Sequence, residues 1–69
     1  MDKVRVGVVG VGALGQHHAR VYASLPGTTL VGVVDIVPGR AEQVAGPLGT
    51  RALSNYADLF GQVDAVSIA

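Results

Sequence analysis

The sequence predicts an α/β fold with a doubly wound parallel sheet. Three stretches, residues 4–9, 28–35 and 63–69, are almost continuously apolar and rich in β-branched residues, which is typical of strands buried on both faces. Stretches with helical periodicity or helix-capping residues lie between the strands. The alternation of strand and helix predicts about four strands and three helices, with a strand order of 3-2-1-4.

The first strand, helix and second strand have the clearest pattern. Strand 4–9 leads into a helix that we place at about residues 13–25, and strand 28–35 follows. Pro26 and Gly27 end the helix, because proline cannot continue it and glycine adopts the turn conformations that follow. Five side chains recur at helical spacing and predict the buried face of this helix: Leu14, His18, Val21, Tyr22 and Leu25.

The second helix has a smaller apolar face. Pro38 suits its first position, where the missing N–H is not needed. Ala41, Val44 and Ala45 share one face, and we expect Gly46-Pro47 to interrupt the helix.

Two short elements precede the fourth strand. Residues 51–53 predict a third strand at the edge of the sheet. Ser54 or Asn55 can cap a third helix, which Gly61 ends. Its apolar residues fall at i, i+3 and i+4: Tyr56, Leu59 and Phe60.

The fourth strand is as apolar as a strand that has a partner on each side. We therefore expect residues 1–69 to be the N-terminal part of a larger protein. The alternative is a complete small domain whose fourth strand is a true edge, prone to association.

Composition excludes several function classes. The 69 residues carry no formal net charge and no basic cluster, so we expect neither nucleic acid nor a membrane surface as a partner. The first apolar run is too short and interrupted for a signal peptide or a membrane span, and we expect a cytoplasmic protein. Without cysteine, the chain has no disulfide or thiolate metal site.

The glycine turn, residues 10–15, carries the functional prediction. In the pattern Gly-x-Gly-x-x-Gly, Gly10 allows a tight turn, Gly12 lets a pyrophosphate approach the backbone, and Gly15 permits close packing of helix on strand. The phosphates would lie on the N–H groups at the helix start, around Ala13 and Leu14. The motif alone is weak and also fits a turn without a ligand, but its place between a strand and a helix favours a dinucleotide.

Asp35 supports this interpretation, since it follows Gly15 by twenty positions and ends the second strand. An acid there accepts hydrogen bonds from the adenosine ribose and repels a 2′-phosphate, so NAD is favoured over NADP. A capping or turn carboxylate is the alternative. Ile36 follows the acid, and Arg40 is close enough to reach the adenine or a 2′-phosphate, although a solvated helix residue is the simpler interpretation.

The remaining polar residues indicate no catalysis. His18 is expected to face the sheet or its rim, with some prospect of lining the cofactor cleft, and His17 the surface. Asp58 and Asp64 are interpreted as a helix-face charge and a strand-start residue. We assign no metal ligand and no catalytic residue.

The chain resembles the N-terminal domain of the glucose–fructose oxidoreductase/inositol dehydrogenase/MocA family, a Rossmann domain. The resemblance extends over all 69 residues and is carried by four stretches: 6–15, 18–22, 30–35 and 64–69. It implies an NAD(P)-dependent dehydrogenase that transfers a hydride between nicotinamide and a sugar, inositol or sugar-nucleotide hydroxyl. It also implies that Ile68 and Ala69 lie near the cofactor.

In the family, the catalytic lysine of a Glu-Lys-Pro motif, a downstream histidine or acid and a C-terminal domain lie beyond this chain. That domain binds the substrate and builds the homo-oligomer. We therefore expect the 69 residues alone to bind cofactor without catalysing the reaction. Two other interpretations stay open: a non-catalytic NAD(H)-sensing regulatory module, and a flavin-binding domain, which would more often carry glutamate at the place of Asp35.

Overall fold

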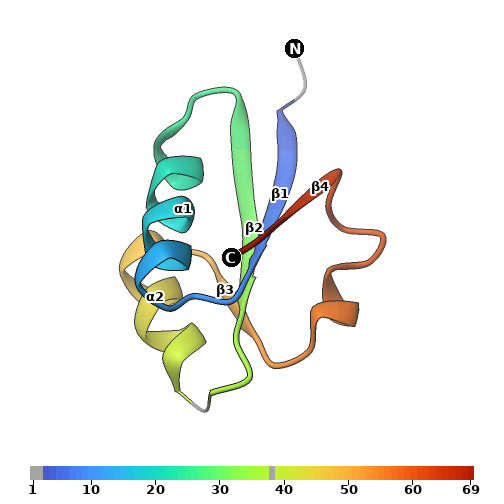
Figure 1. The fold of residues 1–69 in the computed structure, drawn as a ribbon. Coiled ribbons are helices and arrows are strands. Elements are labelled where there is room, and N and C mark those ends of the chain that lie inside the picture. The colour runs from blue at the N-terminus through green and yellow to red at the C-terminus, as the bar shows by residue number, and fades with distance from the viewer. Residues whose placement is uncertain (1–2, 38) are drawn as a thin grey trace.

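The computed structural model describes residues 3–37 and 39–69 and contains one four-stranded parallel sheet. The elements in chain order are β1 (Val4–Val9), α1 (Ala13–Ser24), β2 (Thr28–Val34), α2 (Arg40–Leu48), β3 (Arg51–Leu53), the 3₁₀ turn η1 (Tyr56–Leu59) and β4 (Ala65–Ile68) (Figure 1). The strand order is β3-β2-β1-β4, which confirms the predicted α/β topology.

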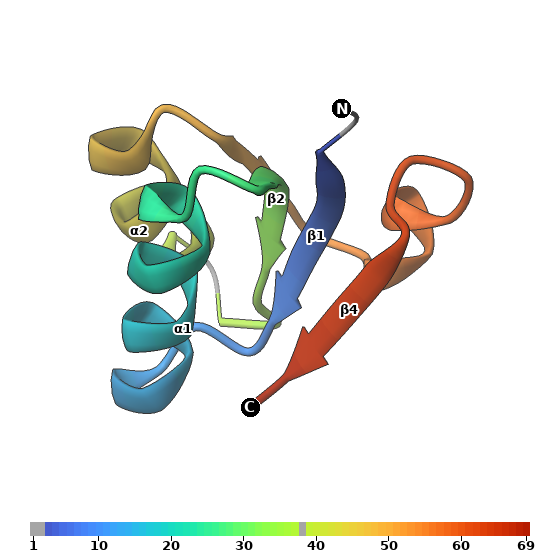
Figure 2. The same cartoon turned by 90° about the horizontal axis from the view of Figure 1, so that it is seen from above.

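The two faces of the sheet are covered unequally. Figure 2 shows α1 and α2 together on one face and the η1 turn, in orange, on the other. The main core lies under the helices, where Val8 and Val33 of the central strands pack with Val44 of α2. On the other face, Leu59 of η1 is 1% exposed, and a Cβ on Gly7 would lie 2.6 Å from its Cδ1. Glycine in β1 is therefore what lets η1 approach the sheet.

The predicted helix α1 is confirmed, but its predicted buried face is partly wrong. Leu14, Val21 and Leu25 are exposed, whereas Gly15 and Ala19 are buried. Small side chains let the helix axis approach the strands closely, and the larger apolar residues are displaced to the rim. Two residues of the predicted face, His18 and Tyr22, are half-buried.

Helix α2 continues through the predicted interruption, and this prediction is wrong. Gly46 and Pro47 lie inside α2, which ends at Leu48. Because Pro47 is the penultimate residue, it removes one backbone hydrogen bond from a turn that is already ending. Gly49, at a φ of 67°, then caps the helix in the left-handed region. The expected helix start at Pro38 lies outside the described residues.

The predicted third helix is a single 3₁₀ turn, so the described residues form two α-helices where three helices were predicted. Asn55 caps it by accepting a hydrogen bond from the Ala57 N–H, and Gly61 ends the segment at a φ of 78°. The few residues between cap and glycine make only i→i+3 bonds such as Phe60 N–H to the Ala57 carbonyl. Of its predicted apolar face, only Leu59 is buried.

Strands β2 and β4 are shorter than predicted, and β3 matches its prediction. In the described part of the chain, neither helix is long and apolar enough to cross a membrane.

Candidate functional site

The glycine turn lies at the carboxyl ends of the parallel strands. Gly10 has a φ of 85°, in the left-handed region, and donates a hydrogen bond of 2.8 Å to the Val34 carbonyl. A Cβ at Gly10 would lie 2.9 Å from the carbonyl oxygen of Ala69. The turn therefore needs glycine here for its backbone angle and for its contact with the end of β4.

The other two glycines of the motif differ in what surrounds them. A Cβ on Gly15 would collide with the carbonyl oxygen of Gly10, so Gly15 closes the turn onto the first turn of α1. Among the described residues, a Cβ on Gly12 would meet Arg40 Nη1 alone, in an ordinary van der Waals contact at 3.8 Å. Gly12 therefore leaves room at the start of the helix.

The amino end of α1 has the features of an anion site. Gly12 occupies the N-cap position, no side chain caps the helix, and its first turn holds no acid. The first N–H groups of a helix have no partner within the helix, so those around Ala13 and Leu14 are available. The helix dipole adds a partial positive charge at the same place.

Asp35 follows β2, and two backbone N–H groups hold its carboxylate beside the glycine turn. Its Oδ2 accepts a 2.9 Å hydrogen bond from the Val11 N–H, and its Oδ1 accepts a 2.8 Å bond from the Val37 N–H. These two N–H groups, with a smaller contribution from the Arg40 guanidinium, hold the pKa of the carboxyl below its ordinary value. The Asp35 side chain is only 5% exposed. It is therefore an ionised carboxylate that ties the glycine turn to the end of β2.

Arg40 and Ile36 lie near Asp35 and line the same pocket as the glycine turn. Arg40 Nη1 lies 3.7 Å from Asp35 Oδ2, and the Arg40 side chain is 42% exposed. Ile36 is 93% exposed, an unusual position for a large apolar side chain.

Two adjoining pockets bring the sequence-predicted residues together. One is a cleft at the start of α1, lined by the glycine turn, Asp35, Ile36, Arg40 and Ala69. The second, about 430 Å³ in volume, lies on the η1 side of the sheet and shares Gly10, Asp35, Ile36 and Ala69, with Ile68 added. All ten predicted site residues therefore line one continuous region, and their role in cofactor binding stays a prediction.

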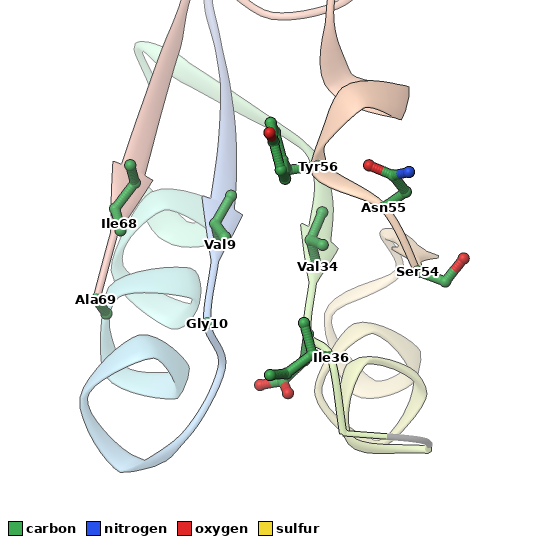
Figure 3. Close-up of a pocket in the computed structure, with 10 residues that line it drawn as sticks. Val9, Gly10, Val34, Ile36, Ser54, Asn55, Tyr56, Ile68 and Ala69 are labelled. Carbon is green, nitrogen blue, oxygen red and sulfur yellow. The ribbon is translucent and has the colours of Figure 1, made fainter.

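The wall of the second pocket contains residues that the sequence did not point to. Figure 3 shows Val9, Val34 and Tyr56 around it, with Ser54 and Asn55 on its rim. The predicted strand order could have identified the residues that follow β3 as part of this pocket. Because β3 lies beside β2, the residues that follow β3 must lie near those that follow β2.

The other polar candidates lie apart from these pockets. His17 is exposed, and His18 Nδ1 lies 3.3 Å from Ser67 Oγ. Asp64 precedes β4 and pairs with Arg5 at 3.1 Å, and Asp58 is exposed in η1. Within residues 3–37 and 39–69, no group of three His, Asp or Glu side chains could hold a metal ion.

Known proteins match the chain over almost its whole length. A family model described as "Oxidoreductase family, NAD-binding Rossmann fold" matches residues 4–69. The UDP-N-acetylglucosamine 3-dehydrogenase of Acidithiobacillus ferrooxidans is 46% identical over 68 residues, which are 99% of this chain and 21% of that protein. Inositol 2-dehydrogenase 3 of Saccharopolyspora erythraea is 44% identical over 62 residues, 88% of this chain and 18% of that protein.

Solved structures share the fold. The crystallised A. ferrooxidans dehydrogenase superposes with a TM-score of 0.90 at 45% identity, over 100% of this chain and 22% of that one. A scyllo-inositol dehydrogenase from Lactobacillus casei, with bound NAD(H) and scyllo-inositol, gives a TM-score of 0.85 at 26% identity, over 99% of this chain and 21% of that one. The chain thus spans about a fifth of the length of these relatives.

Proposed function

The chain belongs to the Gfo/Idh/MocA oxidoreductase family with its NAD-binding Rossmann fold, and on this premise we propose that it provides the NAD site of a dehydrogenase acting on ring hydroxyls of a sugar, an inositol or a sugar nucleotide. The matched relatives support the substrate class, since UDP-N-acetylglucosamine and inositol both carry ring hydroxyl groups. When bound, NAD supplies the hydride acceptor for oxidising such a group.

The observation that carries the proposal is the room left at Gly12, where an added Cβ would make only an ordinary contact with the end of the flexible Arg40 side chain. This residue faces the cleft beside an uncapped helix end, so a pyrophosphate could contact the backbone N–H groups of α1 there. A side chain at this position would fill that space. Gly10 and Gly15, in contrast, are required by the packing of the turn itself.

Asp35 supports recognition of the ribose. An ionised carboxylate has about four lone-pair positions, and the Val11 and Val37 N–H groups use two of them. Two positions remain, which matches the two hydroxyls of an adenosine ribose. The negative charge would repel a 2′-phosphate, which favours NAD over NADP as the cofactor.

The apolar pocket beside Asp35 supports binding of the adenine. Val9, Val34 and Tyr56 line it, and its volume of about 430 Å³ lies within the range of small-molecule sites. Ile36, almost fully exposed in this structure, would gain an apolar partner from a purine.

Titration calorimetry of the intact protein with NADH and NADPH tests the cofactor assignment. We expect NADH to bind more tightly, and Asp35→Asn, which keeps the size but removes the charge, to narrow the gap by about tenfold. Asp58→Asn, an exposed acid in η1, is the matched control and should leave both affinities unchanged. Equal affinities in the starting protein would refute the ribose assignment, and absence of NADH binding would refute the cofactor site.

Activity is tested separately by following NADH formation at 340 nm with inositols and UDP-N-acetylglucosamine as candidate substrates. Cofactor binding without turnover of any such ring alcohol would argue for a sensing module instead of a dehydrogenase.

A further inference from the structure

One polar contact joins the helix of the glycine turn to the last strand. Ser67 Oγ of β4 lies 3.3 Å from His18 Nδ1 of α1, in a half-buried position. In the part of the chain that the structure describes, it is the one side-chain hydrogen bond between α1 and β4. With Nε2 protonated, Ser67 donates to Nδ1, and with Nδ1 protonated, Ser67 accepts.

Both residues of this contact are close in the chain to residues of the proposed NAD site. His18 lies one helical turn after Gly15, and Ser67 lies two residues before Ala69. Ala69 lines the cleft and lies against the start of α1, because its Cβ is 3.6 Å from where a Cβ on Gly15 would lie. Ser67 also pairs with Val8 of β1, so this part of β4 is held by the sheet as well as by α1.

We propose that His18 is a positioning residue that holds the end of β4 against the start of α1 and so sets the width of the NAD cleft. This inference rests on the proposed cofactor site. The contact requires a polar atom at the Nδ1 position, close to the α1 backbone, and not the full imidazole ring. Removing either partner deletes this hydrogen bond between α1 and β4.

The chain offers a matched set of variants. His18→Asn places an amide atom where Nδ1 lies, whereas His18→Leu keeps the bulk of the side chain without a polar atom. Ser67→Ala removes the partner hydroxyl and little else. His17→Leu changes the neighbouring exposed histidine and serves as the control.

The test is NADH affinity of the intact protein, measured by calorimetry beside denaturant unfolding. We expect His18→Leu and Ser67→Ala each to weaken NADH binding about fivefold. The double variant should lose no more than either single variant, because both changes break one contact. His18→Asn should stay within about twofold of the starting protein, and His17→Leu should not differ from it.

Three results would overturn the inference: NADH binding by His18→Asn as weak as by His18→Leu, additive losses of affinity in the double variant, or a lower unfolding free energy with unchanged NADH affinity. If His18→Leu fails to fold, Ser67→Ala and His18→Asn still decide between these outcomes. A starting protein that does not bind NADH refutes the proposed cofactor site and, with it, this inference. Binding by the starting protein with no rescue by Asn refutes the inference alone.

Discussion

A pair of glycine-to-alanine substitutions separates the two roles that glycine has in the turn. Gly12→Ala adds a methyl group that would make only an ordinary contact with Arg40 Nη1, and Gly15→Ala adds one where the carbonyl oxygen of Gly10 already lies. The same chemical change should therefore act on cofactor binding at Gly12 and on folding at Gly15.

The magnitudes follow from the local geometry. Gly12 has a φ of −67° in extended backbone, which alanine adopts freely. Alanine is a poorer N-cap residue than glycine, but it also makes the unfolded chain less flexible. Because these two effects offset each other, the unfolding free energy should change by less than about 0.5 kcal/mol. At Gly15 the clash is with backbone, which cannot rotate away. The cost of about 3 kcal/mol is reduced by about 1 kcal/mol from better helix propensity, which leaves a net loss of about 2 kcal/mol.

NADH binding should be weakened more by Gly12→Ala than by Gly15→Ala, the opposite of the order for stability. A methyl group on Gly12 would occupy the path of the pyrophosphate, so NADH affinity should fall at least about tenfold, or about 1.4 kcal/mol. Calorimetry with NADH and denaturant unfolding on both variants measure the two effects. Unchanged NADH affinity in Gly12→Ala would refute the open approach at Gly12. Full stability of Gly15→Ala would refute the close contact within the turn.

Two further predictions concern the sheet away from the cofactor. Hydrogen bonds from the Arg5 side chain and backbone lower the pKa of the Asp64 carboxyl from its ordinary value of 3.8. The ionised carboxylate therefore stabilises the fold above pH 3.8, and this contribution is lost as the pH falls through the lowered pKa. Denaturant midpoints measured from pH 5 to pH 2 should therefore decline less steeply in Asp64→Asn, and an identical decline would contradict this. Leu59→Ala should lower the unfolding free energy by about 3 kcal/mol, because the side chain is buried against Gly7, whereas Phe60→Ala, at 68% exposed, should cost less than about 0.5 kcal/mol. Equal losses in the two variants would refute the assigned core.

The course of the chain could be predicted from the sequence because glycine and proline mark where elements end. Pro26-Gly27 and Gly61 fall where α1 and η1 give way to turns, and the apolar runs between such residues form parallel strands. Pro47 misled the prediction, since a proline near the end of a helix removes little.

The buried face of α1 could not be predicted from side-chain size. Helical periodicity gives weight to large apolar residues such as Leu14 and Leu25, yet Gly15 and Ala19 make the contact with the sheet. How close a helix lies to a sheet depends on the turn that leads into it. Here Gly15 packs directly on the backbone of Gly10, which brings the small residues inward.

The pairing of glycine turn and acid has a structural reason that its sequence spacing does not reveal. Asp35 Oδ2 accepts a hydrogen bond from the Val11 N–H, in the middle of the glycine turn, so the two parts of the motif form one hydrogen-bonded unit before any ligand binds. An acid at the end of β2 would therefore stabilise this turn even in a protein that binds no ribose. It follows that loss of NADH binding in an Asp35 variant cannot by itself establish contact with the ribose. Only the change in preference between NADH and NADPH isolates the charge, because the turn serves both cofactors equally and the 2′-phosphate alone distinguishes them.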